Sequence, residues 1–171
     1  MSQIMDGTSI EKTLRRISHE IIEKNVRLEN VLFIGIAKKG VPLAERIAEN
    51  IETYEHVKIP VYSLDISKYR DDEKWKETQN DPIPVNGKTC ILVDDVLFTG
   101  RSVRAAMDAL MDFGRPDKIQ LAVLIDRGHR ELPIRPDYVG KNIPTAQDET
   151  IVVLFGSSEA GVTIEKKENG K

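Results

Sequence analysis

Two adjacent carboxylates, followed by a small hydroxylated turn, are the side chains of this sequence best suited to bind a ligand. Asp94 and Asp95 follow an apolar run at residues 90–93, and Thr99-Gly100-Arg101-Ser102 comes shortly afterwards. A carboxylate accepts hydrogen bonds from sugar hydroxyls. A small turn at the start of a helix favours a phosphate, because the free N–H groups and the helix dipole attract an anion. The segment therefore predicts a site for a phosphorylated sugar of the ribose 5-phosphate type.

Other interpretations of the acid pair are open. Asp94 and Asp95 alone are compatible with a solvated strand end, followed by an ordinary N-cap turn at residues 99–102. A receiver or a phosphatase uses such acids to hold Mg²⁺, but neither class explains the phosphate-binding turn on the same loop. The Walker pattern G-x-x-x-x-G-K-[ST] and the dinucleotide pattern G-x-G-x-x-G are absent from the sequence. The combination of acids and turn favours the phosphorylated sugar.

Apolar strands alternate with amphipathic helices along the chain, and these elements must position the site. The alternation predicts an α/β fold with a mostly parallel central sheet flanked by helices. In such sheets, ligands bind beyond the carboxyl ends of the strands, where the acid pair is expected to lie. Strands are predicted at residues 31–36, 57–66, 90–93 and 119–125 and near Ile151, and helices at residues 10–28, around 41–51 with Pro42 near the first turn, and at 103–111.

Two polar segments interrupt this pattern. Residues 67–86 are charged and contain two prolines, so we expect a flexible active-site loop, since long loops in compact domains are often functional lids. Residues 157–171 are expected to form a polar tail that frays. The length of 171 residues, without repeats or a linker, predicts a single domain over residues 1–171.

The overall composition argues against several classes of protein. The formal net charge of −3 gives no general attraction to nucleic acid or to membranes. No apolar run approaches the roughly 20 residues of a membrane-spanning helix. The N-terminus lacks a targeting pattern, and the single Cys90 can form neither an internal disulfide nor a cysteine-based zinc site. We therefore expect a cytoplasmic protein with no membrane partner.

The segment CILVDDVLFTGRS resembles the phosphoribosyl-pyrophosphate (PRPP) signature of type I phosphoribosyltransferases. Four further stretches are similar to one group in this family, the bacterial pyrimidine-operon attenuation regulators, which are also uracil phosphoribosyltransferases. These stretches are LDISKYRDD, GRPDKIQLAVLIDRGHRELPIR, YVGKNIPT and, in the first helix, RISHE. The resemblance extends over most of the chain. It implies the type I phosphoribosyltransferase fold, with a long flexible loop and a small hood.

The resemblance implies where PRPP and Mg²⁺ bind. Asp94 and Asp95 would hold the ribose hydroxyls, and Lys38-Lys39-Gly40 would meet the pyrophosphate. The regulators commonly have Thr-Arg-Gly at this turn, so the two lysines keep the charge but lose the bidentate fork of arginine. Mg²⁺ would be held mainly by PRPP near the acid pair, without dedicated protein ligands. The 5-phosphate would be surrounded by Val96, Leu97, Phe98, Thr99, Gly100, Arg101 and Ser102, where the family often has a small residue in place of Phe98.

The resemblance also implies a lid and a base-binding hood. The long loop would bring Lys68, Tyr69 and Arg70 over bound PRPP, and Arg70 would assist catalysis by stabilising the leaving anion. Without the resemblance, Arg70 is an ordinary solvated cation. Uracil would displace pyrophosphate to give UMP, in a hood formed by Arg127, Gly128 and the strand near Ile151.

A second function, RNA binding, is implied by basic residues that match the regulators. Without the resemblance they form a mixed-charge solvated surface, because acids such as Glu131 and Asp137 interleave with them. With it, the leader mRNA of the pyrimidine operon becomes a partner, and bound UMP or UTP would raise RNA affinity. A dedicated uracil, or other base, phosphoribosyltransferase without an RNA role is the alternative, and a homo-oligomer is expected in either case. The RNA-binding candidates are Arg16, His19, Arg130, Arg135 and Lys141.

Overall fold

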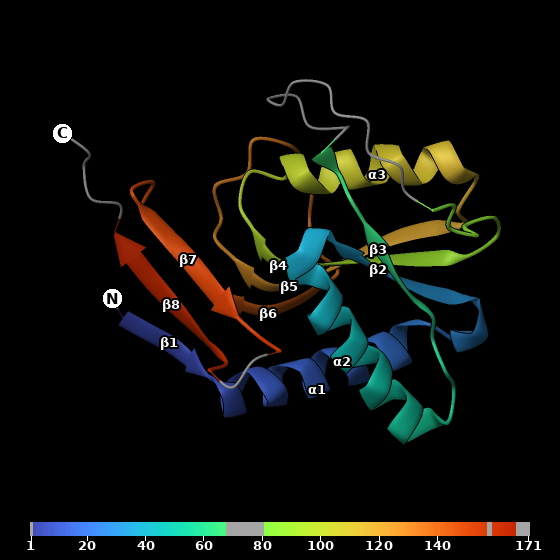
Figure 1. Cartoon of the computed structure of the whole chain (residues 1–171), viewed down its shortest axis with the longest axis horizontal. Coiled ribbons are helices and arrows are strands. Elements are labelled where there is room, and N and C mark those ends of the chain that lie inside the picture. Colours follow the sequence, from blue (N-terminus) through green and yellow to red (C-terminus); the bar gives the residue numbers. More distant parts are fainter. Residues whose placement is uncertain (1, 68–80, 157–158, 167–171) are drawn as a thin grey trace.

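Amphipathic helices cover the two faces of a central sheet (Figure 1). The computed structural model describes residues 2–67, 81–156 and 159–166. Helices α1 (Gly7–Lys24) and α2 (Ala37–Glu55) bury their apolar stripes in one core cluster on one face. Helix α3 (Arg101–Phe113) packs into a second cluster on the opposite face. The layers are therefore helix, sheet, helix, as the sequence predicts for an α/β fold.

The central sheet has five strands, all parallel, in the order β3-β2-β4-β5-β6. Strands β2, β4 and β5 lie inside the sheet and are buried on both faces, which explains their continuous apolar runs. The predicted parallel sheet is confirmed. The strand bounds are β2 (Val31–Ile36), β3 (Val61–Leu64), β4 (Thr89–Leu97), β5 (Lys118–Asp126) and β6 (Tyr138–Asn142).

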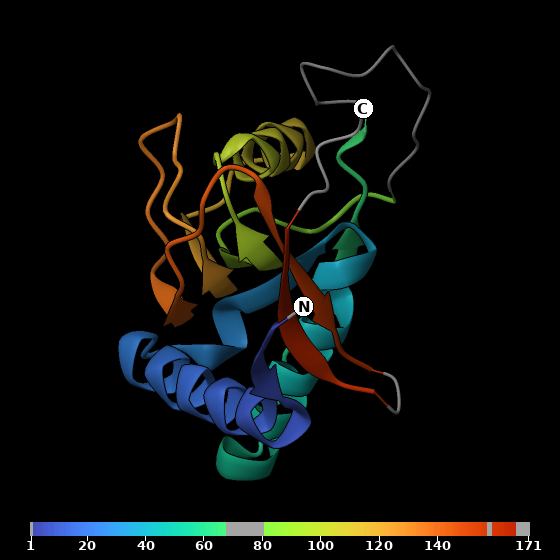
Figure 2. The same cartoon turned by 90° about the vertical axis from the view of Figure 1, so that its left-hand side faces the viewer.

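A smaller antiparallel sheet lies at one end of the molecule, on the left of Figure 1 and facing the viewer in Figure 2. It contains β1 (Ser2–Asp6), β8 (Gly161–Lys166) and β7 (Glu149–Leu154), in that order. Val162 in the middle strand is fully buried and packs into the same core as α1 and α2. This sheet is the hood of the fold.

The prediction of a polar, frayed tail at residues 157–171 is wrong where β8 forms. This strand pairs with β1 on one side and β7 on the other, so its backbone hydrogen bonds are satisfied on both edges. The sequence signal was weak because β8 has only six residues and its last two are charged and exposed. Strands β1 and β6 were also not predicted from the sequence, for the same reason of length.

The ends of several other elements differ from the predictions. Helix α1 stops at Lys24, where the Asn25 N–H caps the Ile21 carbonyl, so Leu28 lies in a separate 3-10 turn. Helix α2 begins at Ala37, and Pro42 stands inside it rather than in its first turn. Strand β3 covers only residues 61–64 of the predicted 57–66. Helix α3 covers Arg101–Phe113 and so extends two residues beyond each end of the predicted 103–111.

The predicted loop at residues 67–86 is only partly described. Ile83 and Val85, near its end, are buried in the α3 core cluster, so this part belongs to the packed structure rather than to a loop over the site. Lys68, Tyr69 and Arg70 lie outside the described residues. Among the residues that are described, no helix combines the length and apolar character needed to span a membrane.

Candidate functional site

The acid pair lies within strand β4, which continues to Leu97, and not beyond the strand as the sequence suggested. The Asp94 carboxylate accepts a hydrogen bond from the Asp95 N–H at 2.8 Å, and the Asp95 carboxylate accepts one from the Val96 N–H at 2.8 Å. Asp94 is 9% exposed. Burial raises the pKa of Asp94 well above its usual range, and the negative charge of Asp95 raises it further. A cation bound beside Asp94, or hydroxyl groups that donate to its carboxylate, would favour the charged form of Asp94.

An open pocket of about 300 Å³ collects the ends of three strands around this pair. Its lining mixes apolar with polar and charged side chains, and it includes a carboxylate that follows β3 and carboxylates of β4. Asp65 and Ser67, just after β3, line this pocket but were not predicted as site residues. The signal that could have identified Asp65 is the one that identified Asp94, an acid at the end of an apolar strand. The lining residues are Ile36, Ala37, Lys39, Asp65, Ile66, Ser67, Asp94, Asp95, Val96 and Ser102.

Helix α2 starts close to the acid pair because two glycines permit it. A Cβ atom on Gly40 would lie 2.2 Å from the Val93 carbonyl oxygen, and one on Gly35 would lie 2.6 Å from the Val41 backbone. Gly35 and Val93 are partners in adjacent parallel strands. The first turn of α2 therefore lies directly on β4, one residue before Asp94. Its free N–H groups and positive dipole end are brought to the same region.

The predicted Lys38-Lys39-Gly40 turn is part of α2, and its two lysines have different positions. The chain turns one step earlier, at Ala37, which has a φ of +53°. Lys39 lines the pocket, and its Nζ donates to the Val153 carbonyl of β7 at 2.9 Å. Lys38 is exposed and is not among the residues that line this pocket. Lys39 thus connects the site to the hood.

The predicted phosphate-binding turn stands at the N-terminus of α3. Gly100 is the N-cap residue, with a φ of +94° that favours glycine. No side chain caps the helix, although the Thr99 hydroxyl accepts a long 3.4 Å hydrogen bond from the Arg101 N–H. The N–H groups of the first turn have no partner within the helix and favour an anion. We call residues 97–102 the phosphate cradle.

Arg127 is buried and holds neighbouring segments together. Its predicted role in a base-binding hood did not indicate this burial. It is 7% exposed, and its Nε donates to the Thr145 hydroxyl at 2.8 Å. Its Nη2 donates to the Glu149 and Ala146 carbonyls, so it holds the loop before β7. Its Cζ lies 3.9 Å from the centre of the Phe98 ring. Burial lowers the pKa of Arg127, and the charge of Glu149 partly opposes this shift.

The other two predicted hood residues have separate environments. Gly128 is exposed with a φ of +84°, and nothing lies within 4 Å of the place where a Cβ would stand. Ile151 is 8% exposed and packs in the core cluster shared with α1 and α2. Neither residue lines the pocket at the acid pair. The described residues contain no group of three or more His, Cys, Asp or Glu side chains arranged to hold a metal ion.

Two RNA-binding candidates lie on α1 and are tied to neighbouring elements. Arg16 is 48% exposed and donates to the Gly140 carbonyl at 2.5 Å and to Glu20 at 2.8 Å, so it fastens α1 to β6. Lys141, exposed on β6, follows Gly140 directly. His19 stacks on Tyr54 of α2, with the ring centres 4.5 Å apart.

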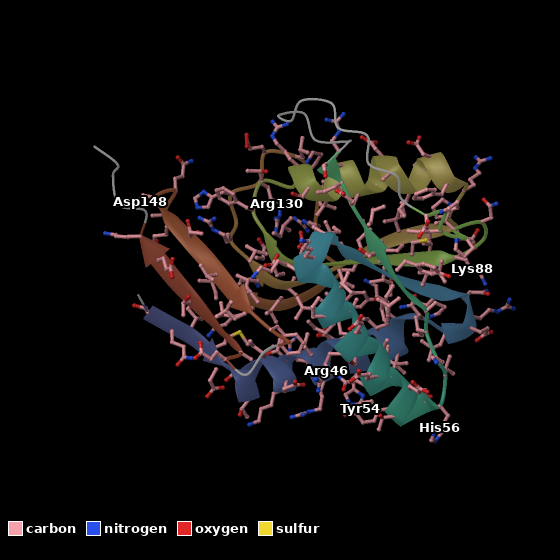
Figure 3. The ribbon with its side chains drawn as sticks, viewed as in Figure 1. Arg46, Tyr54, His56, Lys88, Arg130 and Asp148 are labelled. Atoms are coloured by element: carbon pink, nitrogen blue, oxygen red, sulfur yellow. The ribbon has the colours of Figure 1, made fainter. Side chains whose placement is uncertain are left out.

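The other two candidates lie on the segment that follows β5. Arg130 forms an ion pair with Asp126, which is buried, whereas Arg135 is exposed. Figure 3 shows Arg130 well away from Tyr54, the stacking partner of His19. The five candidates therefore lie on α1, on β6 and on the segment after β5, which are neighbouring parts of the fold.

The parallel sheet, the acid pair on β4 and the two helix N-termini beside it define an α/β protein in which two positions suited to anions lie beside a carboxylate pair. The family model for the phosphoribosyl transferase domain matches residues 1–160, and the chain belongs to this family. Relatives named bifunctional protein PyrR include those of Halalkalibacterium halodurans, 54% identical over 96% of this chain and 97% of its own, and Limosilactobacillus reuteri, 55% identical over 95% and 97%. The family that the sequence suggested is confirmed.

Solved structures show the same fold. A hypoxanthine phosphoribosyltransferase from Trypanosoma cruzi, in complex with the product IMP, matches with a TM-score of 0.76 over 96% of this chain and 89% of that chain, at 15% identity. One from Staphylococcus aureus matches with a TM-score of 0.72 over 89% and 81%, at 18% identity. The predicted type I phosphoribosyltransferase fold is confirmed by this likeness.

Proposed function

We propose that this phosphoribosyltransferase converts uracil and PRPP to UMP and pyrophosphate, and that it also binds the leader RNA of a pyrimidine operon. The observation that carries the enzymatic proposal is the placement of Asp94 and Asp95 between the N-termini of α2 and α3. PRPP presents two hydroxyls between a 5-phosphate and a diphosphate. Two anion sites on either side of a carboxylate pair match this pattern of charges.

Each part of the site has a role in the proposed reaction. The phosphate cradle, with Thr99 and Ser102, would bind the 5-phosphate, and the first turn of α2 with Lys39 would face the diphosphate. The bond from C1 to the diphosphate breaks, and its electron pair leaves with pyrophosphate. A bond from C1 to N1 of uracil forms, and the N1 proton passes to the departing pyrophosphate or to solvent. Asp94 and Asp95 hold the hydroxyls and stabilise the positive charge that develops on the ribose ring. No protein nucleophile is needed.

The oxygen-rich walls of the pocket fit Mg²⁺ that arrives with PRPP. Asp65, Asp94 and Asp95 all line the pocket, and carboxylate oxygens are ligands that Mg²⁺ accepts directly or through water. When bound, Mg²⁺ would neutralise charge on the departing pyrophosphate. Asp65, Asp94 and Asp95 would help to hold that ion, directly or through water.

A base panel tests the enzymatic proposal. Purified protein is incubated with PRPP, Mg²⁺ and either uracil, hypoxanthine, guanine or adenine, and nucleotide and pyrophosphate are both quantified. We expect equimolar UMP and pyrophosphate with uracil, and loss of turnover in the Asp94→Asn/Asp95→Asn double variant. The matched control is Asp108→Asn, an exposed acid on α3 that should keep wild-type turnover. Preference for a purine, or turnover in the double variant, would contradict the proposal.

The RNA proposal is supported by the bifunctional relatives and by exposed cations on neighbouring elements. Arg135 and Lys141 are both exposed, and no ion pair occupies them within the described part of the chain. Phosphate contacts from such residues make binding salt-dependent. Bases in unpaired loops would supply specificity. A chain of net charge −3 gains RNA affinity only through such local groups.

Charge-removal variants test this surface. Arg135→Ala and Lys141→Ala should each weaken binding to the leader RNA and reduce the salt dependence of log Kd by about one. Lys118→Ala is the matched control, an exposed lysine at the amino end of β5 that should leave both quantities unchanged. Arg130→Ala is unsuitable, because it would leave the buried Asp126 carboxylate without its ion-pair partner. Unchanged affinity in both variants would favour an enzyme without an RNA role.

We also propose that residues 1–171 form a single phosphoribosyltransferase-like domain that acts in the cytoplasm as a homo-oligomer. The match of the family model to residues 1–160 supports one domain. Sedimentation equilibrium measures the oligomeric state directly.

A further inference from the structure

The phosphate cradle is joined to the segment that carries Arg130 and Arg135. The Arg127 N–H donates to the Leu97 carbonyl at 2.9 Å, and the Thr99 carbonyl accepts from the N–H groups of Glu131 at 2.9 Å and Leu132 at 3.3 Å. These bonds link residues 97–99 to residues 127–132 at both ends. The cradle backbone thus supports the backbone of the segment.

Side chains also connect the phosphate cradle to residues 127–135. An added Cβ on Gly100 would lie 3.4 Å from Ile134 and 3.6 Å from Leu132, so both side chains cover the turn that begins α3. Arg101, the first residue of the helix, lies 3.7 Å from the Glu131 carboxylate. If the cradle moves when phosphate binds, residues 131–134 would therefore move with it.

Phe98 lies in this contact region between the phosphate cradle and residues 127–135. Its ring packs against the Arg127 guanidinium at 3.9 Å and meets the His129 ring edge-on, with centres 5.4 Å apart. Arg127 donates to the Thr145 hydroxyl, and a ring nitrogen of His129 contacts the Thr145 carbonyl. One aromatic side chain of the cradle thus touches two residues that are both fixed to the loop before β7.

We propose that Phe98 is a positioning residue through which an occupied phosphate cradle orders residues 127–135 and presents Arg130 and Arg135 to RNA. This inference rests on the proposed function, and it assigns the regulation of the site to one side chain. A phosphate bound to the cradle N–H groups fixes the backbone whose carbonyls hold the segment. RNA then binds a segment that is already ordered, so the free energy of ordering is not required a second time. By reciprocity, RNA raises nucleotide affinity by the same factor.

Two variants of Phe98 separate this role from simple packing. Phe98→Leu keeps apolar volume but removes the ring face that holds Arg127, whereas Phe98→Tyr keeps the ring. We measure Kd for leader RNA with and without UMP, and Kd for UMP with and without RNA. In the wild type we expect coupling of at least about 5-fold in both directions. We expect it to fall below about 2-fold in Phe98→Leu and to be kept in Phe98→Tyr, with UMP binding alone changed less than coupling.

Hydrogen exchange gives a readout that needs no RNA. UMP should slow exchange of the Arg127, Glu131 and Leu132 amides in the wild type and in Phe98→Tyr, but not in Phe98→Leu. Wild-type coupling in Phe98→Leu, or equal protection in all three proteins, would overturn the role of Phe98 and leave the proposed function intact. Leader RNA binding that UMP does not change in the wild type would overturn this inference, whereas a wild type that does not bind the leader RNA at all would overturn the proposed RNA function.

Discussion

The buried carboxyl of Asp94 shows how function and stability oppose each other at a single residue. Its pKa is raised because burial and the neighbouring Asp95 both disfavour the charge. The folded protein therefore binds this proton more tightly than the unfolded chain does. Stability from this group is complete below the usual pKa of 3.8 and is lost as the pH rises through the raised value in the folded protein. In the proposed reaction, bound PRPP and Mg²⁺ would favour the charged form of Asp94, which the folded protein alone disfavours.

Substitution of Asp94 should stabilise the protein while it reduces activity. Asp94→Asn keeps an oxygen for the Asp95 N–H but carries no charge, so its free energy of unfolding at pH 8 should exceed that of the wild type by at least about 1 kcal/mol. The difference should shrink as the pH falls and vanish well below the usual pKa of 3.8, where Asp94 is neutral in both the folded and the unfolded chain. Turnover should fall by about 100-fold or more. Urea unfolding at several pH values checks the first claim, and an equal midpoint at pH 8 would contradict it.

Single residues also show where sequence reasoning stops. Asp94, Asp95 and Ser102 could be placed at one pocket because acids at a strand end and a hydroxylated helix start are local patterns. The contact of Lys39 with the Val153 carbonyl could not be predicted, because it joins residues far apart in the chain. The burial of Arg127 was also not predicted. Charged side chains are expected at the surface unless the fold supplies partners, and the partners of Arg127 come from residues 145–149.

At the scale of elements, the approach of α2 to β4 decides the shape of the site. Gly40→Ala places a methyl group 2.2 Å from the Val93 carbonyl, so the helix must shift away from the strand. We expect a loss of about 1–3 kcal/mol in the free energy of unfolding and a raised KM for PRPP, because Lys39 and the helix N-terminus move with it. Gly7→Ala is the control, where the nearest atoms lie at 3.3 Å and 3.5 Å. Equal effects in both variants would contradict this role of Gly40.

The elements also separate what the sequence predicted from what it did not. The long, buried strands β2, β4 and β5 and the periodic helices were predicted because each carries a strong local pattern. Strands β1 and β8 have five and six residues, and each is stabilised by pairing with the other. Such pairing depends on the rest of the fold, so the small sheet of the hood could not be predicted from local patterns.

At the scale of the whole molecule, one end of the parallel sheet serves both proposed functions. The pocket lies at the ends of β3, β2 and β4, and residues 127–135 follow the end of the neighbouring β5. N–H groups of that segment donate to the Leu97 and Thr99 carbonyls, and these hydrogen bonds connect the two regions. A protein of net charge −3 can therefore combine a small-molecule site with a local RNA-binding surface, and the first can regulate the second.

Titration of the leader RNA with and without UMP tests this central claim most directly. The titration is carried out with the intact wild-type protein at fixed Mg²⁺ and at several salt concentrations, with an unrelated RNA of equal length as the control. The account predicts that UMP tightens binding of the leader RNA by at least about 5-fold and leaves the unrelated RNA bound weakly. Equal affinity for the two RNAs, or a leader affinity that UMP does not change, would contradict it.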